Sequence, residues 1–239
     1  AFAAARIPEV LLLLPLAALG SAALGLVIGL FVSRYRDIFF GMLNLALSMV
    51  FYSLLEKLYS VTHGGDGIRV PPTTVLGMAL TTEGLGWALL ILALVLALVF
   101  GALVRTYLAS PMGSALAGIK TRETRLEFMG VPARRVLLAA YVLSALMAGC
   151  AGVVISLSTR HVTPALAYWT ASGELVFIAV LGGTGSVIGP FIGAVAYELT
   201  RVYAAALVAE AWQMILGGVL LAVILFAPGG LWGIGRGLL

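Results

Sequence analysis

RTYLASPMGSALAGIKTRETRLEFMGVPARR, residues 105–135, is a polar stretch in an otherwise apolar chain. Long apolar runs lie on both sides of it. In a membrane protein, basic residues concentrated in one short loop indicate that the loop faces the cytoplasm. We therefore expect residues 106–134 to form a cytoplasmic segment between two transmembrane helices. The stretch carries six of the chain's 14 Lys and Arg residues: Arg105, Lys120, Arg122, Arg125, Arg134 and Arg135.

The same segment contains helix signals. Ser110-Pro111 is a typical helix start, and Gly118 and the Gly130-Val131-Pro132 triplet are typical stops. Residues 118–130 can form about three helical turns, with Leu126 and Met129 on one face. The segment is thus predicted to be a short amphipathic helix-turn-helix, suited to docking a soluble motor protein.

Composition places the chain in the membrane class. It is 62% hydrophobic and 10% charged, with a mean hydropathy of +1.13. Its apolar runs exceed the ~18 residues of a spanning helix and are continuous, which favours helices over a barrel. We expect an all-α polytopic protein with a single transmembrane domain over residues 1–239. The net charge of +4 lies in loops, so nucleic-acid binding is not expected, and Cys150 is predicted to be a buried small residue.

Charged residues and turn residues divide the chain into spans. The predicted spans are residues 10–32, 38–59, 86–104 and 136–157, with residues 34–37 as a cytoplasmic turn. The loops at 61–84 and 158–172 are then external. The first contains VTHGGDGIRVPP, whose Gly and Pro residues predict a lack of regular structure.

The last third of the chain can hold two long crossings or three short ones, and three are favoured. The break is GGTGSVIGP at 182–190, where four glycines and Pro190 cannot continue a straight helix. This gives about six or seven transmembrane helices, one of them discontinuous. Irregular backbone at membrane depth requires cover by protein or a water-filled path. The break is therefore either a tight packing site or part of a translocation path, with Gly182, Gly183, Gly185, Gly189 and Pro190 as path candidates.

Polar residues inside apolar spans are further candidates. Glu198 and Arg201 are three residues apart on one helical face and are predicted to pair. Glu174 begins an apolar run, where helix capping is the favoured interpretation. Asn44 is a path candidate that could instead hydrogen-bond across helices.

No signature of an enzyme is present in residues 1–239. The chain has no Gly-Lys pair, hence no phosphate-binding G-x-x-x-x-G-K-[ST] loop, and GGTGSVIG has neither the spacing nor the context of a dinucleotide fingerprint. His63 and His161 are too far apart in sequence to predict a metal site. We expect a transport protein that does not hydrolyse ATP by itself.

Several segments together resemble the LivM-type permease of branched-chain amino-acid ABC importers. They are SRYRDIFFGMLNLALSMVFYSL with VTHGGDGIRVP, then SPMGSALAGIKTRETRLEFMGV, and last SGELVFIAVLGGTGSVIGPFIGA with LFAPGGLWGI. The second of these segments lies in the polar stretch 105–135, which we call the basic island. The resemblance covers nearly all of the chain from about residue 25. It departs in three respects: the family usually has further spans before residue 10, Asn44 replaces a usual Thr, and the island lacks a usual Asn. The missing spans indicate a fragment, a renumbered chain or a shortened relative.

The resemblance implies a type II importer permease fold, akin to the vitamin B12 and ribose importer permeases, in a bacterial or archaeal cytoplasmic membrane. It implies a second homologous permease subunit, two ATPase subunits that bind ATP and Mg²⁺, and an extracytoplasmic solute-binding protein. This chain itself would need no cofactor. The residues expected to dock the ATPase are Gly118, Lys120, Arg122, Glu123, Arg125 and Gly130.

Three alternatives stay open at this point. A permease of the same family for urea, amides or another small solute would look alike in sequence. An ion-coupled secondary transporter or channel would need intramembrane acids, for which only Glu174 and Glu198 could serve. A structural membrane subunit would use the basic island as a scaffold.

Overall fold

The computed structural model describes residues 9–71, 82–207, 212–227 and 229–237. The chain divides into two compact units, residues 1–168 and 169–239. Both are helical, and the strands of the described residues amount to one pair of two residues each. The prediction of an all-α polytopic fold is confirmed, while a single permease domain stays a prediction.

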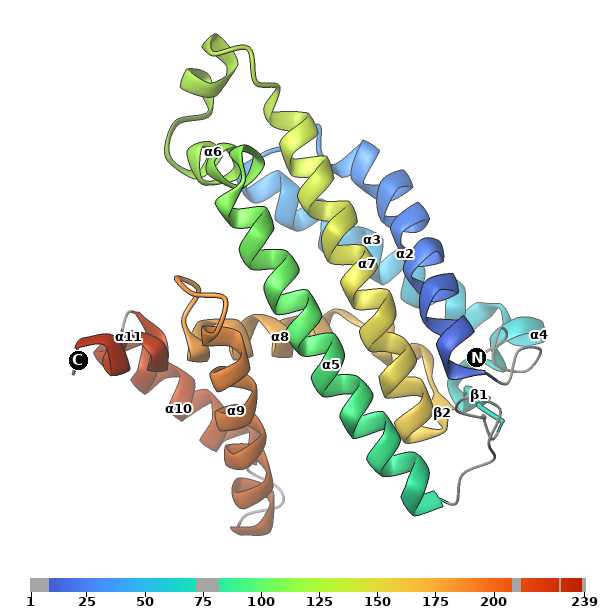
Figure 1. Cartoon of the computed structure of the whole chain (residues 1–239). Coiled ribbons are helices and arrows are strands. Elements are labelled where there is room, and N and C mark those ends of the chain that lie inside the picture. Colours follow the sequence, from blue (N-terminus) through green and yellow to red (C-terminus); the bar gives the residue numbers. More distant parts are fainter. Residues whose placement is uncertain (1–8, 72–81, 208–211, 228, 238–239) are drawn as a thin grey trace. The chain divides into compact units, whose positions relative to one another are not determined.

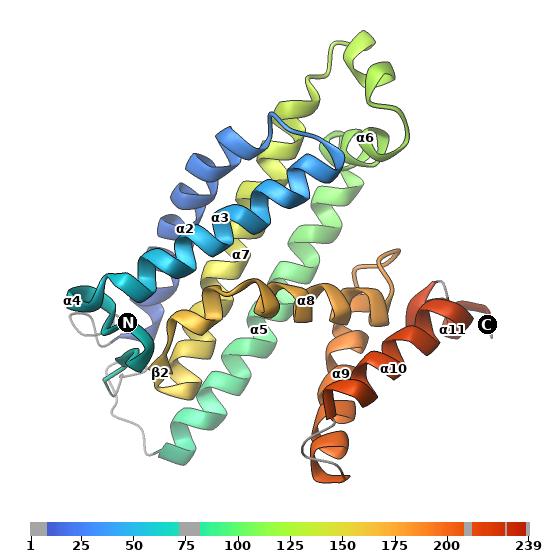
Figure 2. The ribbon, with the colours of Figure 1, turned by 180° about the vertical axis from the view of Figure 1, so that it is seen from behind.

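The N-terminal unit is built from long helices (Figures 1 and 2). Helix α2 packs along α7 in the most extensive helix contact of the unit, and α5 and α6 also contact α7. Apolar residues of α2, α5 and α7 form a buried cluster around Leu13, Leu89 and Leu157. The helices are α2 (Val10–Val32), α3 (Asp37–Lys57), α5 (Thr82–Ala109), α6 (Pro111–Phe128) and α7 (Ala133–Thr159).

The observed helices match the predicted spans and extend some of them. Helix α2 has the predicted bounds, whereas α5 and α7 begin earlier and end later than predicted. Helix α7 has 27 residues and is therefore about 40 Å long, against a hydrocarbon core of about 30 Å. Its ends, including Arg134 and Arg135, continue the helix past the apolar run, which hydropathy alone does not reveal.

Small residues let α2 and α7 approach closely. A Cβ on Gly25 would collide with the Ala145 methyl group, and a Cβ on Gly149 would collide with Ser21. On α7 the closest approach is made at Ala145 and Gly149.

The end of the unit near Val10 is closed by backbone pairing. After α3 come α4 (Tyr59–Thr62), the 3-10 turn η1 (Gly64–Asp66) and strand β1 (Ile68–Arg69). Strand β1 pairs antiparallel with β2 (His161–Val162), which precedes the 3-10 turn η2 (Pro164–Ala167). The expectation of no regular structure here was wrong, because the partner strand lies far away in sequence. The two segments predicted to be external thus meet at one end of the unit.

The C-terminal unit contains α8 (Trp169–Gly182), α9 (Gly189–Leu207), α10 (Trp212–Phe226) and α11 (Gly230–Gly237). Residues 183–188 are not helical, so the predicted break is confirmed. The stretch before residue 227 holds three helices, and the favoured three crossings stay a prediction. Helix α8 begins at Trp169, so the last residues of the predicted external segment 158–172 are helical.

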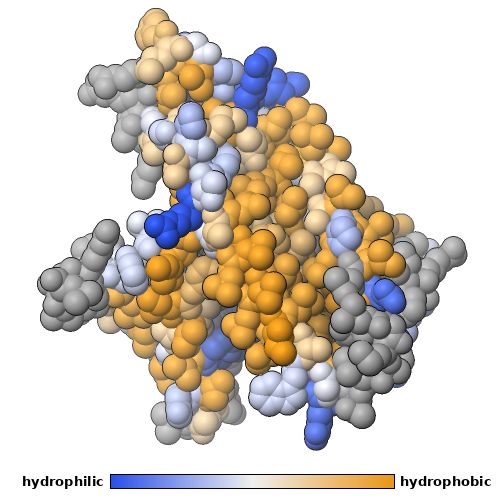
Figure 3. Space-filling model, viewed as in Figure 1, coloured by the Kyte–Doolittle hydropathy of each residue, from blue (hydrophilic) through white to orange (hydrophobic). Residues whose placement is uncertain are grey.

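In the described part of the chain, five helical stretches are long and apolar enough to cross a membrane: Leu12–Val32, Ile38–Lys57, Glu83–Ala109, Ala133–Thr159 and Trp212–Gly233, the last of which includes α10, the start of α11 and residue 228, whose structure is not described. Helix α8 is apolar but shorter. Hydrophobic residues cover most of α5 and α7 on the face drawn in Figure 3, and hydrophilic residues gather beside α6. The chain is a multi-pass membrane protein, and the count of six or seven spans stays a prediction.

Candidate functional site

The basic island folds into α6, whose two ends are set by local sequence. Ser110 precedes the helix, and its hydroxyl accepts a hydrogen bond from the Gly113 N–H at 3.4 Å. Helix α6 spans Pro111–Phe128, but it is not one straight rod: a Cβ on Gly118 would lie 2.8 Å from Leu126 Cδ1, whereas residues eight apart in a straight helix are about 12 Å apart. The segment therefore folds back on itself between Gly118 and Leu126, as the predicted helix-turn-helix requires.

Helix α6 ends where the second glycine signal predicts. Gly130 has φ +78°, a left-handed conformation that favours glycine. The Gly130 N–H donates to the Glu127 carbonyl at 2.9 Å, and the Val131 N–H donates to the Leu126 carbonyl at 3.1 Å. This pair of bonds is a Schellman motif, which satisfies the last carbonyls of a helix. Met129 lies past the helix end, so it does not share a helical face with Leu126.

The residues predicted to dock an ATPase all lie on α6 or at its end. Gly118, Lys120, Arg122, Glu123 and Arg125 are helical, and Gly130 forms the terminating turn. The side chains of Lys120, Arg122 and Arg125 lie outside the described part of the structure. Phe128 and Met129 are 93% and 73% exposed, and of these two the sequence analysis missed Phe128. They add an apolar patch to the basic segment.

Glu123 has a partner within the chain. Its Oε1 accepts a hydrogen bond from Arg36 Nε at 2.6 Å, and both side chains are 27% exposed. Arg36 also donates to the Ser33 carbonyl at 2.5 Å. The α2–α3 turn is therefore attached to the middle of α6 by a charge-assisted bond between residues 87 positions apart.

A second bond ties the neighbouring helix to the same end of α2. Arg134, at the start of α7, donates to the Leu30 carbonyl at 3.1 Å. Both segments that the sequence predicts to be cytoplasmic therefore meet near the C-terminal end of α2. The β1–β2 pair lies at its N-terminal end, since Val70 and Val10 belong to one buried cluster. A helix of 23 residues separates the two ends by about 35 Å.

Asn44 takes part in a bond between helices. Its Oδ1 accepts a hydrogen bond from the Tyr141 hydroxyl at 3.0 Å, joining α3 to α7. Of the two interpretations left open by the sequence, the interhelical bond is the one observed. A role in a translocation path stays a prediction.

The glycine break is a place of close backbone packing. A Cβ on Gly182 would collide with the Gly189 carbonyl oxygen, and one on Gly193 would collide with the Ile178 carbonyl oxygen. Helices α8 and α9 therefore approach each other at backbone distance. Gly185 is different, because the space around its Cβ position is open within 4 Å. Gly185 is therefore not a site of tight packing, and its place on a translocation path stays a prediction.

The break also contacts the part of the chain that follows α10. Gly183 has φ +103°, and a Cβ there would collide with the Gly229 carbonyl oxygen. Gly230, with φ +69°, lies against Gly183 in turn. The two glycine-rich motifs near 182–190 and 225–234 thus pack against each other. This contact favours a structural role for Gly183.

Glu198 and Arg201 pair as predicted, with Nη1 of Arg201 3.4 Å from Oε1 of Glu198. The guanidinium of Arg201 also lies 5.6 Å from the centre of the Trp212 ring. Glu174 does not cap a helix, since α8 begins five residues earlier at Trp169. The apolar run that begins at Glu174 starts five residues after α8 does. The run alone therefore predicted the helix start at the wrong residue.

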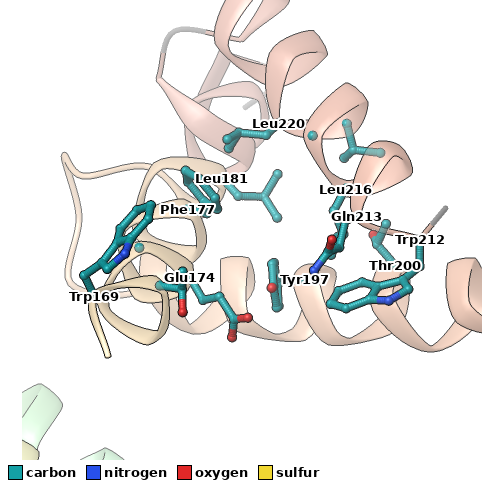
Figure 4. Close-up of a pocket in the computed structure, with 14 residues that line it drawn as sticks. Trp169, Glu174, Phe177, Leu181, Tyr197, Thr200, Trp212, Gln213, Leu216 and Leu220 are labelled. Atoms are coloured by element: carbon teal, nitrogen blue, oxygen red, sulfur yellow. The ribbon is translucent and has the colours of Figure 1, made fainter. Parts of the chain in front are cut away.

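Glu174 instead borders a cavity of about 300 Å³ lined by α8, α9 and α10 (Figure 4). The carboxylate of Glu174, the hydroxyl of Tyr197 and the amide of Gln213 lie toward one side of it. Leu181, Leu216 and Leu220 lie toward the other side. Sequence reasoning missed this cavity, because its walls come from three separate helices.

Comparisons with known proteins agree with this architecture. The model of the family described as "Branched-chain amino acid transport system / permease component" matches residues 1–225. Two curated relatives, from Salmonella typhimurium and Escherichia coli, are each named "High-affinity branched-chain amino acid transport system permease protein LivM". Each is 28% identical over 244 residues, covering 91% of this chain and 56% of the relative.

The chain thus spans little more than half the length of these relatives. No solved structure matches it. The family match extends over all five apolar helices except the last residues of the fifth, and it includes α6 and the glycine break. On this basis the chain belongs to the family of permease components of branched-chain amino acid transport systems.

Proposed function

We propose that the chain is a transmembrane permease subunit of an ATP-binding-cassette importer. It translocates branched-chain or related amino acids across a bacterial or archaeal cytoplasmic membrane. Its partners are a second homologous permease subunit, two ATPase subunits that bind ATP and Mg²⁺, and an extracytoplasmic solute-binding protein. The observation that carries the proposal is the family match over residues 1–225, together with the names of the two relatives.

The structure of α6 supports its use as the coupling segment. It is a basic helix at the end of the unit that the distribution of charge assigns to the cytoplasm. Exposed Phe128 and Met129 offer an apolar contact, and Arg134 and Arg135 are also exposed. Apolar anchors surrounded by charge are common in protein interfaces.

Attachment of α6 to the α2–α3 turn provides a route for coupling. Binding of ATP by the partners supplies the free-energy difference between inward-open and outward-open states. A displacement of α6 pulls on Arg36 through Glu123 and on Leu30 through the adjoining Arg134. The ends of α2 and α3 then move with the docking segment, and the permease alternates between the two states.

The proposal is tested by purification followed by transport. Tagged permease, expressed with its neighbouring transport genes, should copurify with ATPase subunits. In vesicles loaded with ATP and supplied with the native binding protein, leucine and valine uptake should exceed urea uptake. Uptake of urea alone would assign the chain to a small-solute permease. Uptake without ATPase subunits, driven by an ion gradient, would overturn the proposal.

Sidedness needs its own measurement. In a Cys150→Ala background, single cysteines at Ser114 on α6 and Thr163 beside β2 should react with an impermeant thiol reagent from opposite sides. Ser114 is exposed and Thr163 is half-buried, so labelling times must be matched on permeabilised membranes first. Labelling of both positions from one side would contradict the topology and the docking role of α6.

A further inference from the structure

We infer that the cavity between α8, α9 and α10 is a binding site for an aliphatic amino acid. The inference rests on the proposed function, which it deepens by naming a place where the substrate binds. The cavity holds about 300 Å³, at the lower end of the range for small-ligand pockets. The description of the family assigns no role to it.

The cavity is divided into a polar side and an apolar side, as a branched-chain amino acid is. Leu181, Leu216 and Leu220 lie together on one side in Figure 4. They form a wall that an isobutyl or isopropyl group can contact at van der Waals distance. Contact with this wall favours binding, because it removes the apolar surface of the ligand from water.

The polar side matches the other end of such a ligand. Glu174 supplies the one formal charge among the described lining residues, and it suits an ammonium group. The Tyr197 hydroxyl and the Gln213 amide face the same side, where they can donate hydrogen bonds to a carboxylate. An aliphatic occupant without an ammonium group would offer the Glu174 carboxylate no opposite charge, which disfavours a hydrocarbon chain as occupant.

Two neighbouring glycines of α10 provide a matched test. Gly217 lines the cavity, whereas Gly218 does not. The Cβ position of each is open within 4 Å, so a side chain can be added to either without a backbone collision. Both changes remove a helix glycine, and their effects on helix propensity cancel in the comparison.

The first measurement is photolabelling of the complete membrane-embedded transporter with a diazirine analogue of leucine. Labelled peptides should map to residues 169–220, and excess leucine should prevent the labelling. Gly217→Leu should reduce labelling about tenfold or more, and Gly218→Leu should leave it within about twofold. Labelling elsewhere, or labelling that leucine does not prevent, would overturn the inference and would leave lipid as the occupant.

The second measurement tests the assignment of Glu174. 3-Methylbutylamine, which keeps the ammonium group of leucine, should prevent photolabelling at lower concentration than 4-methylpentanoate, which keeps the carboxylate. Glu174→Gln should abolish this preference, while Glu83→Gln, the same change on an exposed residue of α5, should preserve it. Equal competition by the two compounds in the wild-type protein would refute the role of Glu174.

Transport separates failure of the inference from failure of the proposed function. With saturating loaded binding protein, Gly217→Leu should lower the maximal rate of leucine uptake about tenfold relative to Gly218→Leu, at equal membrane abundance. Normal uptake by Gly217→Leu would refute the site and leave the proposed function intact. A wild-type complex that moves no branched-chain amino acid would refute the function, and photolabelling would still decide whether the cavity binds one.

Discussion

The α8–α9 crossing and the attachment of α6 hold parts of the chain together in opposite ways. At the crossing, glycines bring two backbones together, and no side chain intervenes at Gly182 or Gly193. At α6, one partly exposed ion pair spans the gap to the α2–α3 turn, and an arginine bond to a carbonyl holds the adjoining start of α7. A backbone contact permits little adjustment, whereas long charged side chains can follow a moving partner. We therefore call the α8–α9 crossing the fixed joint and the attachment of α6 to the α2–α3 turn the mobile joint.

The largest effect is expected at the fixed joint. Gly182→Leu places a side chain where the Gly189 carbonyl lies, and backbone cannot give way as a flexible side chain can. Overpacking typically costs about 1–3 kcal/mol, and this change should fall at the upper end of that range. The yield of monodisperse protein after detergent extraction and its thermal midpoint measure the effect. Gly185→Leu is the control, because its Cβ position is open. Equal losses in the two variants would contradict the fixed joint.

A smaller loss of stability than for Gly182→Leu is expected at Gly183, where the fixed joint depends on the backbone conformation. Gly183 has φ +103°, which an L side chain rarely adopts. Gly183→Ala should lower the free energy of unfolding by about 1–3 kcal/mol from strain. Gly185→Ala again serves as the control, measured by thermal unfolding in the same detergent. A Gly183→Ala variant as stable as its control would show that the contact with Gly229 and Gly230 relaxes freely.

At the mobile joint, the expected effect is on coupling more than on stability. Glu123→Lys sets a like charge against Arg36, and a partly exposed ion pair contributes only about 0–1 kcal/mol to folding. Membrane abundance should therefore stay near normal, while substrate-stimulated ATP hydrolysis by the assembled importer falls. The positive-inside bias predicts unchanged topology.

The reversed pair tells the two roles of Glu123 apart. Arg36→Glu combined with Glu123→Arg keeps the ion pair within the chain and should restore stimulated hydrolysis. If Glu123 acts only by pairing with a basic group on an ATPase, the double variant should stay as defective as Glu123→Lys. That result would remove the attachment of α6 from the coupling route and keep its docking role.

The smallest effect concerns a neutral bond that belongs to neither joint. Tyr141→Phe removes the hydrogen bond to Asn44 between α3 and α7. Such bonds in membrane proteins contribute about 0.6 kcal/mol on average. Tyr203→Phe, on an exposed side chain, is the matched control for thermal unfolding. A loss of transport without a loss of stability would instead support a place for Asn44 on the translocation path.

Features that depend on neighbouring residues could be predicted from the sequence. Continuous apolar runs predicted the helices, because each spanning helix satisfies its own backbone in lipid. Ser110 and Gly130 predicted the ends of α6, because capping uses groups within a few residues of the helix end. The break at 182–190 followed from its glycines and Pro190.

Contacts between residues far apart in sequence could not be predicted, because they depend on how the helices pack. The bond between Arg36 and Glu123, the pairing of β1 with β2, and the contact of Gly183 with Gly230 join residues far apart in sequence. The cavity beside Glu174 likewise needs three helices at once. Local sequence patterns limit which secondary structure each segment can form. Which segments then contact each other depends on the packing of whole helices, and the energy of that packing depends on how well their shapes fit within each unit.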